Sequence, residues 1–244
     1  MKISYYNFKK IFFNIHYTPI HPQWLAYKHD LQKFTIINKW ARGLVVDIGC
    51  SDKHISKYLS SNTEYIGLDY YTTASQWYQT RPHIYGDAQD LPFSSESMDT
   101  LLLLDVLEHL PSPDSCFKEI KRVLKPSGLL IIQVPFLYPL HDTPLDFHRW
   151  SIYGLRCLAK KYELEIIEEA YLGNPLETAG LLSNIAICKL FINWFKQKNP
   201  MLLFTPLVPL VVITINLASR FISALTIKDT FMPHGYRLIL KRGL

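Results

Sequence analysis

Acidic residues stand directly after several apolar segments of this chain, a placement that suits the binding of a polar or cationic ligand. Residues 44–48 are apolar apart from Asp47, and a turn of small residues, Gly49, Cys50 and Ser51, follows them. This pattern is typical of a buried parallel strand that ends in a ligand-facing loop. Gly49 lets a ligand approach the backbone, and the set of glycines typical of phosphate loops is absent. We therefore expect a cationic group near Asp47, with an ordinary loop acid as the alternative interpretation.

The combination of an apolar strand and an acid recurs along the chain. Asp69, followed by Tyr70, ends a short apolar segment about twenty residues later, where a carboxylate can accept hydrogen bonds from both hydroxyls of a ribose. Asp87 and Ala88 lie in a third turn, and Asp105 follows a fourth apolar segment. Because the carboxyl ends of parallel strands share one edge of a sheet, these side chains are expected at one ligand site.

Histidines and further charges occupy residues 135–150, a loop after the predicted fifth strand. We predict that His148 is a general base oriented by Asp146, with His141 and His109 as further candidates for moving a proton. The alternative is that these residues only hold the loop through hydrogen bonds.

Arg149 and Trp150 end this loop and are predicted to bind the substrate. A guanidinium group can bind a phosphate or carboxylate through two parallel hydrogen bonds. For Arg149 the alternative is a salt bridge to Asp142 or Asp146.

Five short motifs occur in order within residues 44–172: Val-Asp-Ile-Gly-Cys, Gly-Leu-Asp, Gly-Asp-Ala-x-x-Leu-Pro-Phe, Val-Leu-Glu-His-Leu and Leu-Lys-Pro-x-Gly. In this order and spacing they resemble the class I S-adenosylmethionine-dependent methyltransferases. The resemblance implies an α/β fold, with a Rossmann-like, mostly parallel seven-stranded sheet and an antiparallel last strand. It also implies S-adenosylmethionine as the cofactor.

The resemblance further implies roles for the acids. Asp47 and Gly49 would line the methionine end of the cofactor, Asp69 would bind the ribose, and Asp87 with Ala88 would hold the adenine. The full predicted cofactor-binding set is Asp47, Gly49, Cys50, Ser51, Asp69, Tyr70, Asp87, Ala88 and Asp105. The sequence departs from the family at residues 51–53, Ser-Asp-Lys, where a further glycine is usual.

A divalent-metal site is an alternative use of the region after the fourth strand. Asp105, Glu108 and His109, joined by His141, could supply the ligands, and some quinone-type O-methyltransferases use a similar cluster. We predict no metal, because Glu-His after the fourth strand is common in the class without one.

Composition divides the chain into four predicted segments. They are an N-terminal helical cap (residues 1–43), a cofactor-binding core (44–172), an apolar helical insert (173–230) and a final strand that completes the core sheet (231–244). Residues 1–43 carry seven Lys or Arg against one acid, residues 44–172 eleven against eighteen, and residues 173–244 eight against two. Basic flanks around an acidic core suit contact with an anionic membrane surface. Nucleic acid is disfavoured, because the chain has no recognition motif and no dense basic run.

The insert is strongly apolar. Residues 201–219 lack any charge, which is the length of a possible membrane span, but Pro206 and Pro209 interrupt this run. One helical stripe that follows is polar, and it consists of Asn216, Ser219, Arg220 and Ser223. We favour helices that lie in the membrane interface. A packed cap or dimer surface and a true span are the alternatives.

The four cysteines show no paired spacing, which favours a reduced, cytosolic protein without structural zinc. The N-terminus does not resemble a signal peptide. We therefore expect a cytoplasmic methyltransferase, peripheral on the inner face of the membrane. Its acceptor would be a small or lipid-linked molecule of the glycan, polyprenyl or quinone-like type, because the insert is apolar and the flanks are basic. The loop pattern His-Asp-x-Pro-x-Asp-Phe-x-Arg is in addition similar to methyltransferases often associated with surface glycan and lipid pathways. The alternative is a non-catalytic binding or assembly module that keeps the fold. The oligomeric state stays open.

Overall fold

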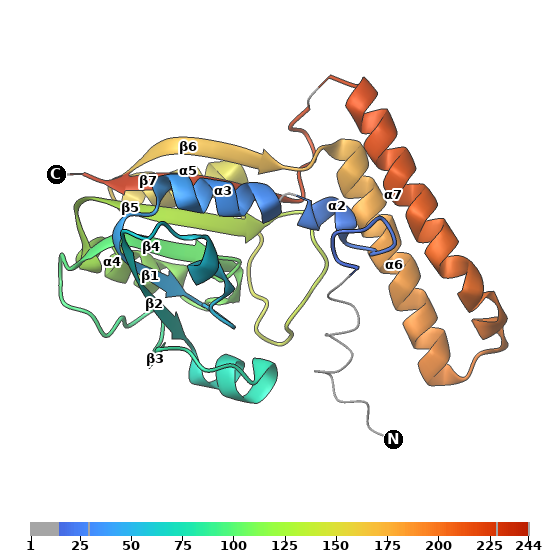
Figure 1. Cartoon of the computed structure of the whole chain (residues 1–244), viewed down its shortest axis with the longest axis horizontal. Coiled ribbons are helices and arrows are strands. Elements are labelled where there is room, and N and C mark those ends of the chain that lie inside the picture. The colour runs from blue at the N-terminus through green and yellow to red at the C-terminus, as the bar shows by residue number, and fades with distance from the viewer. Residues whose placement is uncertain (1–14, 29, 228, 244) are drawn as a thin grey trace. The chain divides into compact units, whose positions relative to one another are not determined.

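The structure, a computed structural model, describes residues 15–28, 30–227 and 229–243, and the chain divides into two compact units. An α/β unit comprises Lys33–Tyr171 together with the strand that begins at Gly235. A helical unit comprises the described residues before Lys33 and Leu172–His234. Figure 1 shows both units along the chain.

A seven-stranded sheet forms the centre of the α/β unit, with the strand order β3-β2-β1-β4-β5-β7-β6. The strands are β1 (Gly43–Ile48), β2 (Thr63–Asp69), β3 (Ile84–Tyr85), β4 (Met98–Leu104), β5 (Leu124–Pro135), β6 (Leu164–Leu172) and β7 (Gly235–Arg242). β1 pairs in parallel with β2 and β4, β4 pairs in parallel with β5, and β7 is antiparallel to β5. This arrangement confirms the predicted fold class.

Helices and short helical turns connect these strands. Those next to the sheet are α3 (Asp30–Trp40), η1 (His54–Tyr58), η2 (Thr72–Tyr78), η3 (Leu107–His109), α4 (Pro113–Val123) and α5 (Ile152–Lys161). Those of the helical unit are α2 (Trp24–Tyr27), α6 (Pro175–Gln197), η4 (Pro200–Leu207) and α7 (Val208–Leu225).

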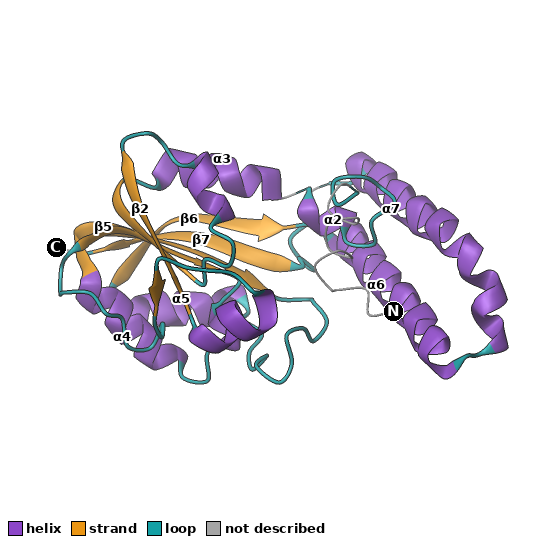
Figure 2. Ribbon diagram, turned by 60° about the horizontal axis from the view of Figure 1, so that its bottom comes forward, coloured by secondary structure: helices purple, strands orange, loops and turns teal. Residues whose placement is uncertain are grey.

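Alternate residues of the central strands bury their side chains on opposite faces of the sheet. Val45 and Leu102 pack with Ile37 of α3, whereas their neighbours Val46 and Leu101 belong to the larger core that α4 and α5 complete. Figure 2 shows α3 on one face of the sheet and α4 with α5 on the other. Strands covered on both faces must be apolar almost throughout, which is why these segments are recognisable in the sequence.

The region predicted as one N-terminal cap is divided between the two units. Residues 15–32 belong to the helical unit, whereas most of α3 belongs to the α/β unit and contributes Ile37 and Ala41 to its core. The two compact units therefore divide after residue 32, whereas the predicted cap extends to residue 43. Residues 1–14 lie outside the described part of the chain.

In the helical unit, α6 and α7 form an antiparallel pair joined by η4 (Figure 1). Polar contacts join the first half of α6 to the last half of α7. Asn184 donates a hydrogen bond to Asn216 Oδ1 at 2.9 Å, and Arg220 Nη1 lies 3.3 Å from Glu177 Oε1. A hydrogen bond also joins Ser223 to the residue that caps α6. The predicted polar stripe of α7 therefore faces α6, which gives it a packing role.

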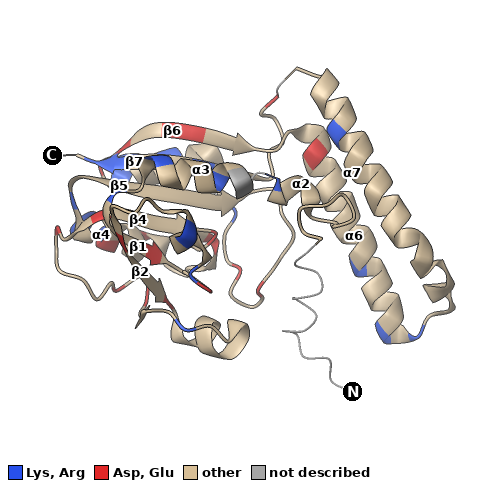
Figure 3. Cartoon of the chain, in the orientation of Figure 1, with Lys and Arg blue, Asp and Glu red and all other residues tan. Residues whose placement is uncertain are grey.

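The remainder of this helical pair is apolar and exposed. By length and composition, Pro175–Gln197 and Pro200–Leu225 could each cross a membrane, and only 28% and 11% of their most apolar stretches are buried. Leu203 is 81% exposed and Phe204 is 45% exposed at the turn between the helices. Figure 3 shows long stretches of both helices without a charged residue. Such low burial is unlike that of a core helix in a soluble domain.

Candidate functional site

The loop after β1 turns tightly against the end of β2. The backbone nitrogens of Gly49 and Cys50 donate to the backbone oxygen of Leu68 at 2.8 and 3.1 Å. Gly49 has a φ of +77°, and a Cβ added there would lie 2.3 Å from Cγ2 of Val106. This position therefore requires glycine. Burial raises the pKa of the Cys50 thiol to about 12, so this predicted cofactor-loop residue packs as a neutral, apolar group.

The residues that replace the usual later glycine keep a glycine-like backbone. Ser51 has a φ of +48° and Lys53 a φ of +60°, both in the left-handed region that glycine adopts most easily. The hydrogen bond from the Ser51 backbone nitrogen to Asp69 Oδ2, at 2.8 Å, holds the loop in this form. Ser51 and Lys53 therefore adopt the left-handed backbone conformation, although Gly49 is the only glycine of the loop after β1. The backbone of this loop is compatible with a bound cofactor.

Asp69 is the point at which this loop meets β2. Its carboxylate is buried and accepts from the backbone nitrogens of Ser51 and Tyr70, both at 2.8 Å. The Thr73 hydroxyl lies 3.0 Å from Asp69 Oδ1 and equally close to the backbone oxygen of Tyr70. Because Thr73 has this second acceptor, Asp69 can exchange that contact for a ligand hydroxyl.

The turn predicted to hold the adenine lies beside Asp69. The backbone nitrogen of Gly86 donates to the backbone oxygen of Asp69 at 3.0 Å. Asp87 Oδ1 accepts from the backbone nitrogen of Gln89 at 2.8 Å, which shapes the turn, and Ala88 is buried within it. The structure therefore brings the two acids predicted for ribose and adenine to neighbouring positions.

Asp47 lies in β1 and is almost fully buried. Its Oδ2 accepts a hydrogen bond from the Tyr65 hydroxyl at 2.7 Å. Burial is the main cause that raises the pKa of Asp47 to about 7. The charge of this carboxyl therefore changes within the physiological range, and a cationic ligand group would favour the ionised form.

This pKa leads to a prediction for the binding of S-adenosylmethionine, whose amino group is cationic. The dissociation constant is expected to fall about tenfold between about pH 6 and pH 7.5, because only ionised Asp47 attracts that cation and a pKa near 7 controls its ionised fraction. Calorimetric titration at several pH values measures this. Asp47→Asn is expected to bind weakly with a flat pH profile, and a profile as steep as that of the unmodified protein would contradict the role of Asp47.

Asp105 belongs to a polar chain that crosses three strands. It follows β4, has a φ of +57°, and its Oδ2 accepts from the Gln133 amide nitrogen at 3.0 Å. Gln133 Oε1 in turn accepts from Nε and Nη2 of the buried Arg237 at 3.0 and 2.7 Å. Gln133 and Arg237 were not predicted as functional residues, although each interrupts an apolar run, Leu129–Val134 in β5 and Tyr236–Leu240 in β7, which is a usable signal.

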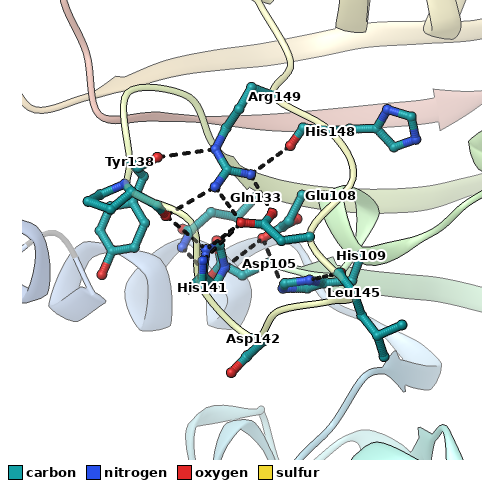
Figure 4. A network of polar contacts seen from close by, with 12 residues as sticks. Asp105, Glu108, His109, Gln133, Tyr138, His141, Asp142, Leu145, His148 and Arg149 are labelled. Carbon is teal, nitrogen blue, oxygen red and sulfur yellow. Dashed lines mark hydrogen bonds and ion pairs between the residues drawn. The ribbon is translucent and has the colours of Figure 1, made fainter.

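The loop of residues 136–151, which has no regular helix or strand before α5, folds back onto η3. The backbone oxygen of Glu108 accepts from the backbone nitrogens of Phe147 and His148 at 2.9 and 3.1 Å. Nδ1 of His109 lies 2.6 Å from the backbone oxygen of Leu145. These contacts hold the loop against η3, and Figure 4 shows the labelled side chains of the loop together with Glu108 and His109.

The Arg149 guanidinium makes its hydrogen bonds within this loop. Its guanidinium donates to Asp146 Oδ1 at 2.5 Å and Oδ2 at 2.7 Å, and to the backbone oxygens of Tyr138, Pro139 and His148. Since all five donors of an arginine are used, none remains for a substrate anion. The structure therefore contains the alternative interaction, a salt bridge to Asp146, and substrate binding by Arg149 stays a prediction. Arg149 lowers the pKa of Asp146 to about 2.

The predicted pairing of His148 with Asp146 is not found in the structure. Asp146 instead binds the Arg149 guanidinium and the backbone nitrogen of His141. The His148 ring instead lies beside Trp150, with 5.3 Å between ring centres. Nε2 of His148 and Nε1 of Trp150 are both buried without a hydrogen-bond partner among the described residues. This pair therefore offers an acceptor and a donor to a polar group.

Three further side chains converge between η3 and the loop. Oε1 of Glu108 lies 3.8 Å from Nε2 of His109 and 3.8 Å from Nε2 of His141. The two imidazole rings meet edge to face, with 4.8 Å between their centres. Contact with Glu108, and with Asp146 on its other side, raises the pKa of His141 above its ordinary value. The two histidines predicted to move protons are thus neighbours, and both face one buried carboxylate.

This chain is similar in sequence to known methyltransferases. The sequence profile of the family described as "Methyltransferase domain" matches residues 46–132. Sterol 24-C-methyltransferase of Clavispora lusitaniae is 26% identical over 168 residues, which are 63% of this chain and 43% of the relative. A probable phthiotriol/phenolphthiotriol dimycocerosates methyltransferase 2 of Mycobacterium ulcerans is 31% identical over 93 residues, 34% of this chain and 36% of the relative. The chain therefore spans less than half the length of these curated relatives.

A solved structure supports the fold. Phosphoethanolamine N-methyltransferase 2 of Haemonchus contortus, solved in complex with S-adenosyl-L-methionine, has a TM-score of 0.53 at 16% identity. The match covers 97% of this chain and 60% of that one. At this identity the likeness concerns the fold alone.

Proposed function

Since this chain belongs to the class I S-adenosylmethionine-dependent methyltransferases, we propose that it transfers a methyl group to a lipid-like or lipid-linked acceptor at a membrane surface. One observation supports methyl transfer most strongly: Asp69, the loop after β1 and the Asp87 turn lie together at one edge of the sheet. S-adenosylmethionine, the cofactor of this family, supplies a methyl group already activated on a sulfonium.

The residues of this chain would hold the cofactor by its charges and hydroxyls. Ionised Asp47 attracts the cationic amino group, and Asp69 accepts from the ribose. The Gly49 turn lets the backbone lie close to the ligand. With an activated donor, the main task of the protein is to align the acceptor with it and to exclude water.

His148 is the proposed general base. Its Nε2 is buried without a hydrogen-bond partner among the described residues, so it is ready to accept a proton from an acceptor hydroxyl or amine. Trp150 Nε1 beside it can donate a hydrogen bond to the same group. Nε2 of His109 and Nε2 of His141 face the Glu108 carboxylate instead, so these histidines take no part in the proposed proton transfer.

Two observations support a lipid-like acceptor. The named relatives are methyltransferases of a sterol and of phthiotriol dimycocerosates. The α6–α7 pair offers an exposed apolar surface, with Lys196 and Lys198 at the end of α6. Apolar residues beside lysines suit the boundary between acyl chains and anionic headgroups. We place the protein at the cytoplasmic face of a membrane, held there by this helical pair.

The proposal predicts that methyl-labelled S-adenosylmethionine transfers its label to a lipid extract of the source cells, with the product in the organic phase. Leu203→Glu combined with Phe204→Glu is expected to abolish flotation with phosphatidylglycerol vesicles and to slow the reaction on lipid at least about tenfold, because a charged residue opposes insertion of this turn. Flotation assays and phase-partition assays measure the two effects.

A matched control is a second double variant, in which two glutamates are introduced in the α/β unit. Tyr153→Glu with Ile167→Glu alters two exposed side chains of the α/β unit and should leave flotation unchanged. Label found only in water-soluble products would refute the lipid acceptor, and equal flotation of both double variants would refute the anchor. A folded protein that binds the cofactor but labels no extract would favour the non-catalytic binding module.

A further inference from the structure

We propose that Glu108, His109 and His141 form a binding site for one divalent transition-metal ion. The three residues come from η3 and from the loop of residues 136–151. One ligand atom of each lies within 4.8 Å of the other two. The proposal reverses the sequence-based expectation of no metal, and it rests on geometry that the sequence does not contain.

The Glu108 carboxylate is the first reason. Its side chain is fully buried, and neither oxygen has a hydrogen-bond partner among the described residues. A buried carboxylate without partners is strongly unfavourable, and proteins normally neutralise such a group with a cation or with hydrogen bonds. Nε2 of His109 and Nε2 of His141 each lie 3.8 Å from Glu108 Oε1, beyond hydrogen-bonding distance.

The orientation of the two imidazole rings is the second reason. Nδ1 of His109 lies 2.6 Å from the carbonyl oxygen of Leu145, and a carbonyl only accepts, so Nδ1 carries the proton. In the neutral ring Nε2 then has a free lone pair, and it faces Glu108. Metal-bound histidines show this arrangement, in which the other ring nitrogen donates to a carbonyl or carboxylate.

His141 repeats the arrangement. Its Nδ1 lies 3.3 Å from the backbone oxygen of Pro139 and 3.4 Å from Asp146 Oδ2, so both neighbours of Nδ1 are acceptors. Asp146 is itself held by Arg149. Carboxylate, histidine and metal in a row form a common support for metal sites. When both rings are neutral and protonated on Nδ1, two lone pairs and one carboxylate thus face a common point.

The donor set indicates the class of metal. Two imidazole nitrogens and one carboxylate oxygen suit Zn²⁺, Mn²⁺, Fe²⁺ or Co²⁺, with bonds of about 2.0–2.2 Å, better than Ca²⁺ or Mg²⁺. Ligand atoms 3.8 Å apart can share one such ion after small side-chain movements. Three protein ligands leave coordination positions open to water or to an oxygen of a small molecule.

Equilibrium dialysis of the full chain against Co²⁺ tests the site. The unmodified protein is expected to bind one ion. Glu108→Gln and His141→Ala are each expected to weaken this binding by at least about 10–100-fold, the loss that already follows when only a residue supporting a metal ligand is replaced. His148→Ala removes a histidine of the same loop that lies outside the cluster, and it should bind Co²⁺ as the unmodified protein does. Equal binding by Glu108→Gln, or no bound ion in the unmodified protein, would overturn the proposal.

Thermal unfolding separates a metal ligand from a structural residue. With a chelator present, Glu108→Gln is expected to unfold at a higher temperature than the unmodified protein, because it removes a buried charge without a partner. With Co²⁺ present the order should reverse, since only the unmodified protein gains stability from the ion. A lower unfolding temperature of Glu108→Gln in both conditions would assign the carboxylate a structural role and refute the site.

Discussion

Replacement of Asp69 by alanine is expected to weaken the binding of S-adenosylmethionine by at least about 100-fold. A carboxylate that accepts two ribose hydroxyls contributes two charge-assisted hydrogen bonds of about 1.5–3 kcal/mol each, and about 2.7 kcal/mol corresponds to 100-fold in affinity. The variant also removes the acceptor of the Ser51 backbone nitrogen, so the loop after β1 loses its tie to β2. Calorimetric titration with the cofactor and with its demethylated product measures the loss.

The control for this variant lies on the same strand. Glu64 is an exposed acid near the opposite end of β2, so Glu64→Ala removes one negative charge from the strand at a distance from the proposed site. Its affinity for S-adenosylmethionine should equal that of the unmodified protein. If Asp69→Ala binds the cofactor equally well while its circular dichroism is native, the assignment of the ribose site to this edge is wrong.

Replacement of Arg149 by alanine is expected to destabilise the protein by about 3–5 kcal/mol, the typical effect of removing one partner of a buried ion pair. The Asp146 side chain is only 1% exposed, and it would keep its charge without the guanidinium that neutralises it. Three backbone oxygens of the loop would also lose a donor. Urea unfolding monitored by circular dichroism gives the free energy of unfolding.

Arg156 provides a matched comparison, because its Nε and Nη2 make two similar hydrogen bonds to Glu169 at 2.8 and 2.7 Å on the protein surface. Arg156→Ala should destabilise the protein far less than Arg149→Ala does, since exposed ion pairs contribute little. The double variant Arg149→Met, Asp146→Leu should recover much of the stability that Arg149→Ala loses, because it leaves no buried charge. A loss for Arg149→Ala no greater than that for Arg156→Ala would show that the loop does not depend on this pair.

The sheet could be predicted from the sequence because its physical cause is local. Strands such as β1 and β4 are covered on both faces, so most of their residues are apolar. Such apolar segments can be recognised in the sequence. The acids after them, Asp47 and Asp69, follow from the same pattern. The family motifs add the order of these segments, and the profile match over residues 46–132 agrees with it.

The loop chemistry could not be predicted because it depends on how the chain folds back. Asp146 and His148 are neighbours in sequence, yet Asp146 turns to Arg149 and His148 turns to Trp150. The approach of His141 to Glu108 joins residues that are 33 positions apart, through a loop without regular structure. Residue types suggested which side chains carry chemistry, but only the fold determines which of them meet.

The polar stripe of α7 illustrates the same limit. The spacing of Asn216, Arg220 and Ser223 places them on one side of a helix, and the sequence leaves open whether water, lipid headgroups or protein faces that side. In the structure, protein faces that side, because Asn216 and Arg220 contact Asn184 and Glu177 of α6. Because these contacts use the polar side of α7, its apolar side is the one left exposed.

The position of β7 has a consequence for the synthesis of the protein. This strand lies between β5 and β6, but the ribosome makes it after both of them and after the whole α6–α7 pair. At about 5–20 residues per second, the more than sixty residues between β6 and β7 take roughly 3–12 s to synthesise. During that interval the edges of β5 and β6 that will bind β7 are unpaired, and the apolar helices leave the ribosome before β7 does. The helices can therefore reach a membrane before the sheet closes, so the proposed attachment to the membrane would precede completion of the cofactor-binding fold.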